Sequence, residues 1–87
     1  MYVILVYDVS VERLNKVRQY LKQYLNWVQN SAFEGELKKG EIEKIKIDLR
    51  KIIKEDEDSI ILYKTPNKRW LSKEILGVEK SEITTII

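Results

Sequence analysis

The chain has 87 residues, of which 44% are apolar and 34% charged, with a formal net charge of +2 and neither cysteine nor histidine. This length and balance predict one globular domain, and the missing cysteines exclude disulfides and thiolate metal sites. The missing histidine removes the usual general base near neutral pH, so any metal would have oxygen ligands, which favours Mg²⁺, Mn²⁺ or Ca²⁺. No apolar run is long enough to span a membrane, and the N-terminus lacks a signal-peptide pattern, so a cytoplasmic protein is expected.

The first predicted strand is the apolar run YVILVY at residues 2–7, which ends at Asp8. Six consecutive β-branched, aliphatic and aromatic residues are typical of a strand buried on both faces in the middle of a sheet. A carboxylate at the end of such a strand is expected to reach water, a cation or a hydrogen-bonding loop, because burial without a partner is costly. Taken alone, Asp8 is weak evidence for a site, since an aspartate often caps or exposes itself at a strand end.

An amphipathic helix is predicted over residues 11–24, with Ser10 as the candidate N-cap. Apolar residues recur at three- and four-residue steps, at Leu14, Val17, Leu21, Tyr24 and Val28. The other faces are basic and carry Arg13, Lys16 and Arg18 soon after the first strand. Such a cluster is either a solvated helix face or a phosphate-binding surface.

Two further strands are predicted within residues 25–37, which read LNWVQN and then SAFEGEL. Ser31 is most simply a hydroxyl that satisfies the bend between these strands. Gly35 indicates a bulge or a close backbone approach. Phe33, like Tyr7, is either a core aromatic or a platform that stacks on a base, and burial statistics favour the core.

A second amphipathic helix is predicted over residues 41–54, and the acidic stretch EDED at 55–58 is interpreted as a solvated turn. Residues 59–63, SIILY, form another apolar strand, which is also expected to lie centrally. Residues 68–74 are short and amphipathic, and their pattern leaves helix and strand open. Trp70 is either an apolar interface anchor or part of a nucleic-acid surface, and we favour the interface.

The predicted order is β-α-β-β-α-β with one more strand, EITTII, over residues 82–87. The first six elements fit an α+β, ferredoxin-like fold with both helices on one face. The last strand must extend an edge, either of its own sheet or of a partner's, and exchange with a second copy is more economical for a chain with so thin a core. We expect a single domain over residues 1–87, with a core at 1–64 and a C-terminal dimerisation segment at 65–87.

One family matches the order and spacing of several segments. They are VYDV at 6–9, RLNKVRQYL at 13–21, WVQNSAFEGEL at 27–37, DSIILY at 58–63 and LG at 76–77. Over nearly the whole chain they resemble the small CRISPR-associated nucleases called Cas-two. The resemblance implies a ferredoxin-like homodimer in which the C-terminal strand completes the partner's sheet. It also implies a Mg²⁺-dependent endonuclease, acting on single-stranded RNA or in some members on duplex DNA, with a role in spacer acquisition and antiviral defence beside the Cas-one integrase.

The resemblance further implies a site at the end of the first strand. Asp8 is carried over as the catalytic metal ligand, with one Mg²⁺ per dimer shared by Asp8 of both chains, and Tyr7 as its catalytic neighbour. Two carboxylates that meet on a two-fold axis repel each other, and a Mg²⁺ between them would relieve the repulsion. The ion would also lower the pKa of a bound water, which could attack a phosphodiester without any histidine.

The resemblance also implies nucleic-acid-binding positions, which are Arg13, Lys16, Arg18, Ser31 and Phe33 in this sequence. The chain departs from some members, which carry adjacent arginines at the start of the first helix, whereas here Arg13 stands beside Leu14. Which basic side chain meets the phosphate is therefore left open.

Two functions of different kinds fit these features. The first is a metal-dependent endonuclease, in which Asp8 is essential. The second is a structural adaptor that dimerises and supports DNA in a complex with the Cas-one integrase, in which Asp8 is dispensable. An RNA-binding module of the RRM kind is disfavoured, because neither candidate strand carries the paired aromatic pattern of that module.

Overall fold

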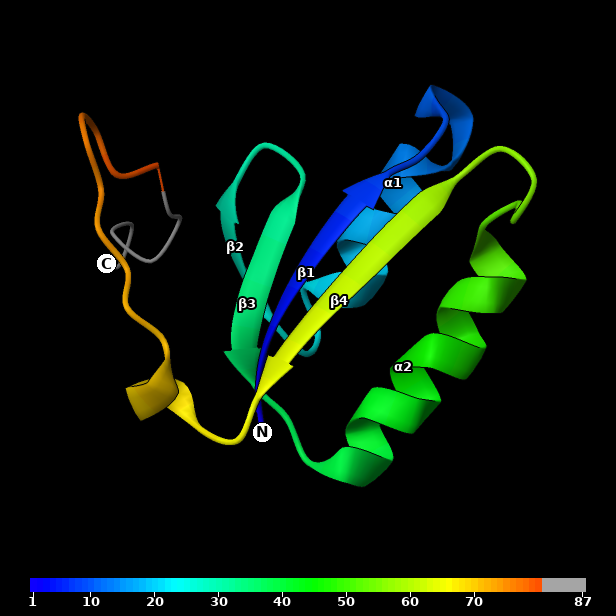
Figure 1. The fold of residues 1–87 in the computed structure, drawn as a ribbon. Helices are drawn as coiled ribbons and strands as arrows, with labels where there is room; N and C mark the ends of the chain where they lie inside the picture. The colour runs from blue at the N-terminus through cyan, green and yellow to red at the C-terminus, as the bar shows by residue number, and fades with distance from the viewer. Residues whose placement is uncertain (81–87) are drawn as a thin grey trace.

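The computed structural model describes residues 1–80, which form a four-stranded antiparallel sheet with two helices on one face (Figure 1). The elements in chain order are β1 (Tyr2–Asp8), α1 (Val11–Leu21), β2 (Asn26–Gln29), β3 (Ala32–Glu36), α2 (Lys39–Ile52), β4 (Ser59–Thr65) and the short 3-10 helix η1 (Lys68–Trp70). The strands lie in the order β2-β3-β1-β4, so the predicted β-α-β-β-α-β fold is confirmed. The strand predicted over residues 82–87 lies outside the described residues.

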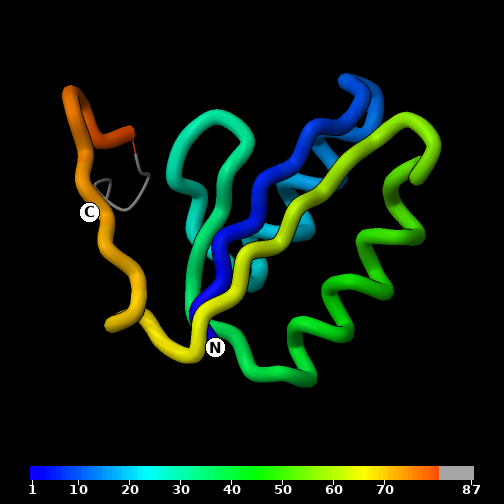
Figure 2. Tube along the Cα trace, viewed as in Figure 1, coloured from blue at the N-terminus to red at the C-terminus, as the bar shows by residue number. Residues whose placement is uncertain are grey.

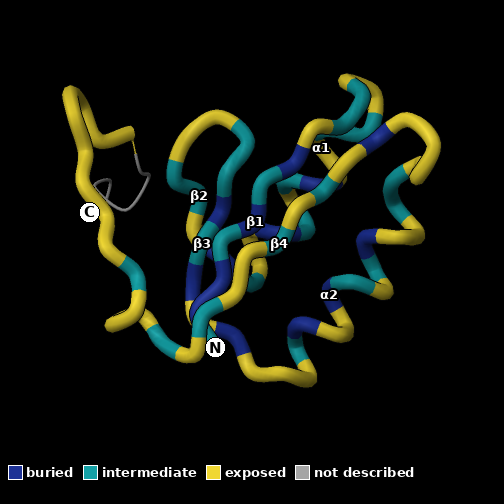
Figure 3. Tube along the Cα trace, viewed as in Figure 1, coloured by how far each residue is buried: buried dark blue, intermediate teal, exposed yellow. Residues whose placement is uncertain are grey.

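The first strand, β1, lies inside the sheet between β3 and β4, as predicted. Val3, Leu5 and Tyr7 are buried in the core with apolar residues of both helices. Ile4 and Val6 alternate with them on the opposite face and are only half-buried, as the colours of Figure 3 show along the strand. The prediction that both faces are buried is therefore wrong for the single chain, because the two helices cover one face only. We call the other face the open face of the sheet.

Within residues 1–80, β4 is an edge strand that pairs with β1 alone, so the expectation that SIILY lies centrally is wrong for this part of the chain. Ile60 and Leu62 pack against the core from the helix side, whereas Ile61 and Tyr63 are exposed on the open face. An apolar run looks the same in a central strand and in an edge strand whose outer face awaits a partner, which explains the error.

Each helix buries one apolar stripe against the sheet. The buried helix residues are Val17, Leu21, Ile42, Ile45 and Leu49. The N-cap position of α1 is Ser10, as predicted, but its hydroxyl bonds to the Glu12 carboxylate rather than to a helix backbone N–H. Helix α2 begins at Lys39, before the predicted residue 41, and Glu41 accepts a 2.8 Å hydrogen bond from the Lys38 backbone N–H.

The close backbone approach predicted at Gly35 is confirmed. A Cβ atom added to Gly35 would lie 3.1 Å from Leu25 Cδ2, so any larger residue would crowd the Leu25 side chain where β3 passes the chain that follows α1. That chain turns early, because α1 ends at Leu21 rather than at residue 24. The irregularity in strand pairing lies in β2 instead, where the register shifts between Trp27 and Gln29.

Candidate functional site

Three segments meet at one end of the sheet, around Asp8 (Figures 1 and 2). Asp8 is the last residue of β1 and is in register with Ser59, the first residue of β4. On the other side, the backbone N–H of Tyr7 donates to the Ser31 carbonyl oxygen at 3.0 Å. Ser31 follows Asn30, whose φ of 43° turns the chain from β2 into β3. The fold thus brings Asp8 and Ser31 to the same end of the sheet.

The Asp8 carboxylate is exposed on the open face, since it continues the alternation of Ile4 and Val6. Within residues 1–80, no hydrogen bond or ion pair engages this carboxylate, and no group of three or more His, Cys, Asp or Glu residues is placed to hold a metal ion. A carboxylate suits a hard, oxygen-seeking cation such as Mg²⁺, but one carboxylate is a sparse ligand set. Water, backbone oxygens or a second molecule would have to supply the remaining ligands.

Tyr7 lies next to Asp8 in sequence but on the opposite face, with 2% of its surface exposed. Its ring centroid is 6.0 Å from that of Phe33, which is fully buried. Burial raises the pKa of the Tyr7 phenol, and the charge of nearby Arg18 partly opposes this rise. The catalytic role of Tyr7 and the nucleic-acid-binding role of Phe33 stay predictions, and in this conformation both rings belong to the core.

The basic residues of α1 point in different directions. Lys16 and Arg18 are two residues apart, which separates them by about 200° around the helix. Lys16 and Arg13 line a shallow groove with Tyr20 and Gln23 on the outside of the helix layer. Arg18 lies on the other side, near the Tyr7 phenol. The basic cluster predicted after Asp8 is therefore divided between two surfaces, and each residue's contact with nucleic acid stays a prediction.

A buried ion pair that the sequence did not reveal lies behind this end of the sheet. Arg13 Nε and Nη2 donate to Asp58 Oδ2 and Oδ1 at 2.6 and 3.0 Å, and Nη2 also donates to Glu57 Oε1 at 2.9 Å. The Asp58 side chain is fully buried and that of Arg13 is 13% exposed. The hydrogen bonds from Arg13 hold the pKa of Asp58 well below its usual range and raise that of Arg13 above its own. The interpretation of EDED as a solvated turn is therefore wrong at its last residue.

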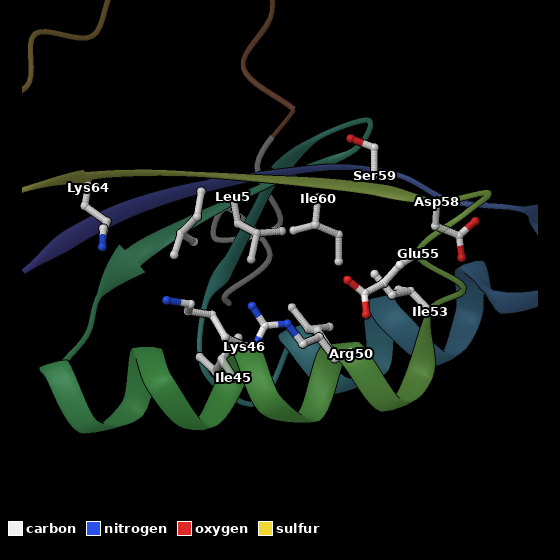
Figure 4. A pocket seen from close by; sticks show the side chains of 12 residues that line it. Leu5, Ile45, Lys46, Arg50, Ile53, Glu55, Asp58, Ser59, Ile60 and Lys64 are labelled. Carbon is white, nitrogen blue, oxygen red and sulfur yellow. The ribbon is translucent and has the colours of Figure 1, made fainter.

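The second hollow is a groove of about 520 Å³ between α2 and the free edge of β4. Figure 4 shows Lys46 and Arg50 extending from α2 and Lys64 from β4, with Leu5 and Ile60 of the sheet on the side opposite α2. The outer edge of β4, which no strand of the described part of the chain pairs with, borders this groove, so an added strand would meet both backbone hydrogen-bonding groups and an apolar surface.

Fold and site together define a small ferredoxin-like α+β protein, with an open apolar sheet face and an exposed carboxylate at the end of its central first strand. No helix within residues 1–80 has the length and hydropathy to cross a bilayer. A family model described as CRISPR associated protein Cas2 matches residues 1–73, and the chain belongs to this family. The resemblance to Cas-two is thereby confirmed.

Individual relatives agree with this assignment. A protein of Methanocaldococcus jannaschii named CRISPR-associated endoribonuclease Cas2 is 55% identical over 87 residues, which is 100% of this chain and 76% of the relative. A protein of the same name from Pyrococcus furiosus is 53% identical over 87 residues, 100% of each chain.

Two solved structures have the same fold. The crystal structure of a Cas2 protein aligns with a TM-score of 0.85 and 48% identity over 100% of this chain and 98% of that one. The crystal structure of Streptococcus pyogenes Cas2 at pH 6.5 aligns with a TM-score of 0.74 and 36% identity, over 88% of this chain and 100% of that one.

Proposed function

We propose that this chain is a CRISPR-associated, Mg²⁺-dependent endoribonuclease. It would cleave single-stranded RNA at an active site that contains Asp8. The observation that carries the proposal is the Asp8 carboxylate, which stands exposed and without a partner in residues 1–80 at the end of an interior strand. The names of the relatives from M. jannaschii and P. furiosus, CRISPR-associated endoribonuclease Cas2, support the same activity.

The proposed active form is a homodimer joined through the open face of the sheet. On this face Val6 pairs with Ile61 and Ile4 with Tyr63, so four apolar side chains form one patch. Ile61 and Tyr63 are about half exposed in the single chain, and contiguous apolar patches of this kind mark interaction surfaces. A second copy of the chain offers the same patch, and residues 82–87 are proposed to complete the partner's sheet along the free edge of β4.

Dimerisation through this face is proposed to bring two Asp8 carboxylates together, which supplies the hard oxygen ligands that one chain lacks. Bound there, Mg²⁺ would supply Lewis acidity to activate water and to neutralise charge on the phosphate. The chain's own residues would hold Asp8 at the strand end, and the RNA backbone would meet Arg18 on one side of α1 and Lys16 on the other. Ser31 shares this end of the sheet with Asp8 and is proposed to contact the RNA.

A second candidate function is the adaptor that supports DNA beside the Cas-one integrase without cleaving. One observation favours it: within residues 1–80, no group of three or more His, Cys, Asp or Glu residues is placed to hold a metal ion around Asp8. A site with so few ligands can lose catalysis while the dimer persists.

The deciding experiment is cleavage of labelled single-stranded RNA and duplex DNA by the wild type and by Asp8→Asn, each with Mg²⁺ and with EDTA. We expect the rate on RNA to fall at least about a hundredfold in Asp8→Asn, to the level of the EDTA reaction. Asp56→Asn removes an exposed loop carboxylate and is the matched control, with the wild-type rate expected. Undiminished cleavage by Asp8→Asn would contradict the site, and a folded dimer inactive on both substrates would favour the adaptor.

A further inference from the structure

We propose that Asp58 and Arg13 are positioning residues, which hold the connection between β1 and α1 in the conformation that places the Asp8 carboxylate. The inference rests on the proposed function, because Asp8 is the residue they position. Neither side chain is expected to touch RNA or the metal ion.

The Asp58 carboxylate accepts hydrogen bonds from two separate segments of the chain, the start of α1 and the residue Lys54 that follows α2. Oδ1 accepts from the Ser10 backbone N–H at 2.9 Å and from Arg13 Nη2 at 3.0 Å. Oδ2 accepts from Arg13 Nε at 2.6 Å and from the Lys54 backbone N–H at 2.9 Å. A carboxylate offers about four acceptor positions, so these four donors occupy its full capacity. Asp58 therefore joins the start of α1 to the chain that leaves α2.

This arrangement bears on Asp8 through a very short connection. Only Val9 and Ser10 stand between Asp8 and the first residue of α1. Asp8 is in register with Ser59, and Asp58 directly precedes Ser59 in the chain. The segment 58–59 thus holds the chain on both sides of Val9, by the strand pairing before it and by the Ser10 N–H after it. Without Asp58, the end of β1 loses its anchor on the helix side.

The chemistry of the pair explains why both partners are needed. The Asp58 side chain is fully buried, and a buried charge without a partner is strongly destabilising. The guanidinium of Arg13 binds both carboxylate oxygens through its planar fork, which a lysine cannot reproduce. Arg13 is therefore committed to Asp58 and Glu57, which leaves Lys16 and Arg18 as the predicted phosphate-binding residues of α1.

The test uses the full chain as Asp58→Asn and Arg13→Lys, with Tyr20→Phe as the matched control. The Tyr20 hydroxyl donates a hydrogen bond to Asp48 Oδ2 at 2.5 Å, which joins α1 to α2 away from Asp8. Removing this hydrogen bond therefore measures the effect of destabilisation alone. Two quantities are measured below each melting temperature: the Kd of Mn²⁺ by electron paramagnetic resonance, and the Mg²⁺ concentration for half-maximal RNA cleavage. Asp58→Asn is expected to raise both about tenfold and Arg13→Lys by less, whereas Tyr20→Phe leaves both unchanged.

Two results would overturn the proposal, and they differ in what they say about the function. If the wild type binds Mn²⁺ and cleaves RNA, and Asp58→Asn lowers only the melting temperature, then Asp58 is structural and the proposed function stands. If the wild type neither binds Mn²⁺ nor cleaves RNA, the proposed function fails and the positioning role fails with it. Should Asp58→Asn not fold, Arg13→Lys decides in the same way, because it keeps the bonds of Asp58 to Ser10 and Lys54.

Discussion

Tyr7 and Asp8, the last two residues of β1, lie in different environments: Tyr7 is buried and Asp8 is exposed. Side chains alternate between the faces of a strand, so Asp8 lies on the open face and Tyr7 under the helices. The Tyr7 ring packs beside Phe33, and burial raises the pKa of its phenol. Tyr7 therefore packs behind the strand end, while the Asp8 side chain is exposed on the open face.

We predict that Tyr7→Phe keeps the rate of RNA cleavage within about twofold of the wild type, because it removes a buried hydroxyl and leaves the ring that packs on Phe33. Single-turnover cleavage of labelled RNA measures this, with Asp56→Asn as a control in the exposed loop. A hundredfold loss of rate at an unchanged melting temperature would instead make Tyr7 a catalytic residue.

At the scale of elements, the close packing of β3 against the chain after α1 depends on one glycine, which has no side chain. Gly35 lies against Leu25, and an added Cβ would come within 3.1 Å of the Leu25 side chain. Gly40 stands in the first turn of α2 with nothing within 4 Å of the same position. At Gly35 the packing against Leu25 requires a small residue. At Gly40 nothing crowds the position, so glycine there brings only its ordinary entropic cost in a helix.

We predict opposite signs for the two alanine substitutions. Gly35→Ala is expected to lower the free energy of unfolding by about 1–3 kcal/mol, because it overpacks the contact with Leu25. Gly40→Ala is expected to raise the free energy of unfolding by about 0.5–1 kcal/mol, because it reduces the freedom of the unfolded chain. Urea unfolding at one fixed protein concentration measures both. A stabilising Gly35→Ala would show that Leu25 moves aside freely.

At the scale of the whole molecule, the sheet has one covered face and one open face. The open face carries Ile61 and Tyr63 opposite Val6 and Ile4, and it ends at Asp8. A second copy on this face would cover the apolar patch and bring a second carboxylate to the site. Under this proposal, dimerisation and cleavage depend on the same surface.

We predict that Ile61→Lys dissociates the dimer and abolishes Mg²⁺-dependent cleavage together, because a lysine in the centre of the patch would be buried without a partner. The Kd of the dimer is expected to rise at least about a hundredfold, as measured by light scattering after size exclusion. Ile47→Lys is the matched control, since Ile47 is similarly exposed, 53% against 48%, but lies on α2. A fully active dimeric Ile61→Lys protein would contradict this interface.

The sequence by itself was enough to predict the order of the elements, the ferredoxin-like topology, the close approach at Gly35 and the position of Asp8 at a strand end. These features depend on local periodicity and on single residue types, which a linear pattern contains. The resemblance carried by WVQNSAFEGEL and DSIILY was similarly readable from order and spacing, and the family model confirms it over residues 1–73.

Only the tertiary structure decided that β4 is an edge strand, that α1 divides its basic residues between two surfaces, and that Asp58 is buried against Arg13. Asp58 and Arg13 are 45 residues apart, and nothing in the acidic stretch distinguishes its last carboxylate from the three before it. Burial and pairing of polar groups are set by which elements pack together. That information is spread across the chain, whereas hydrophobic periodicity is local.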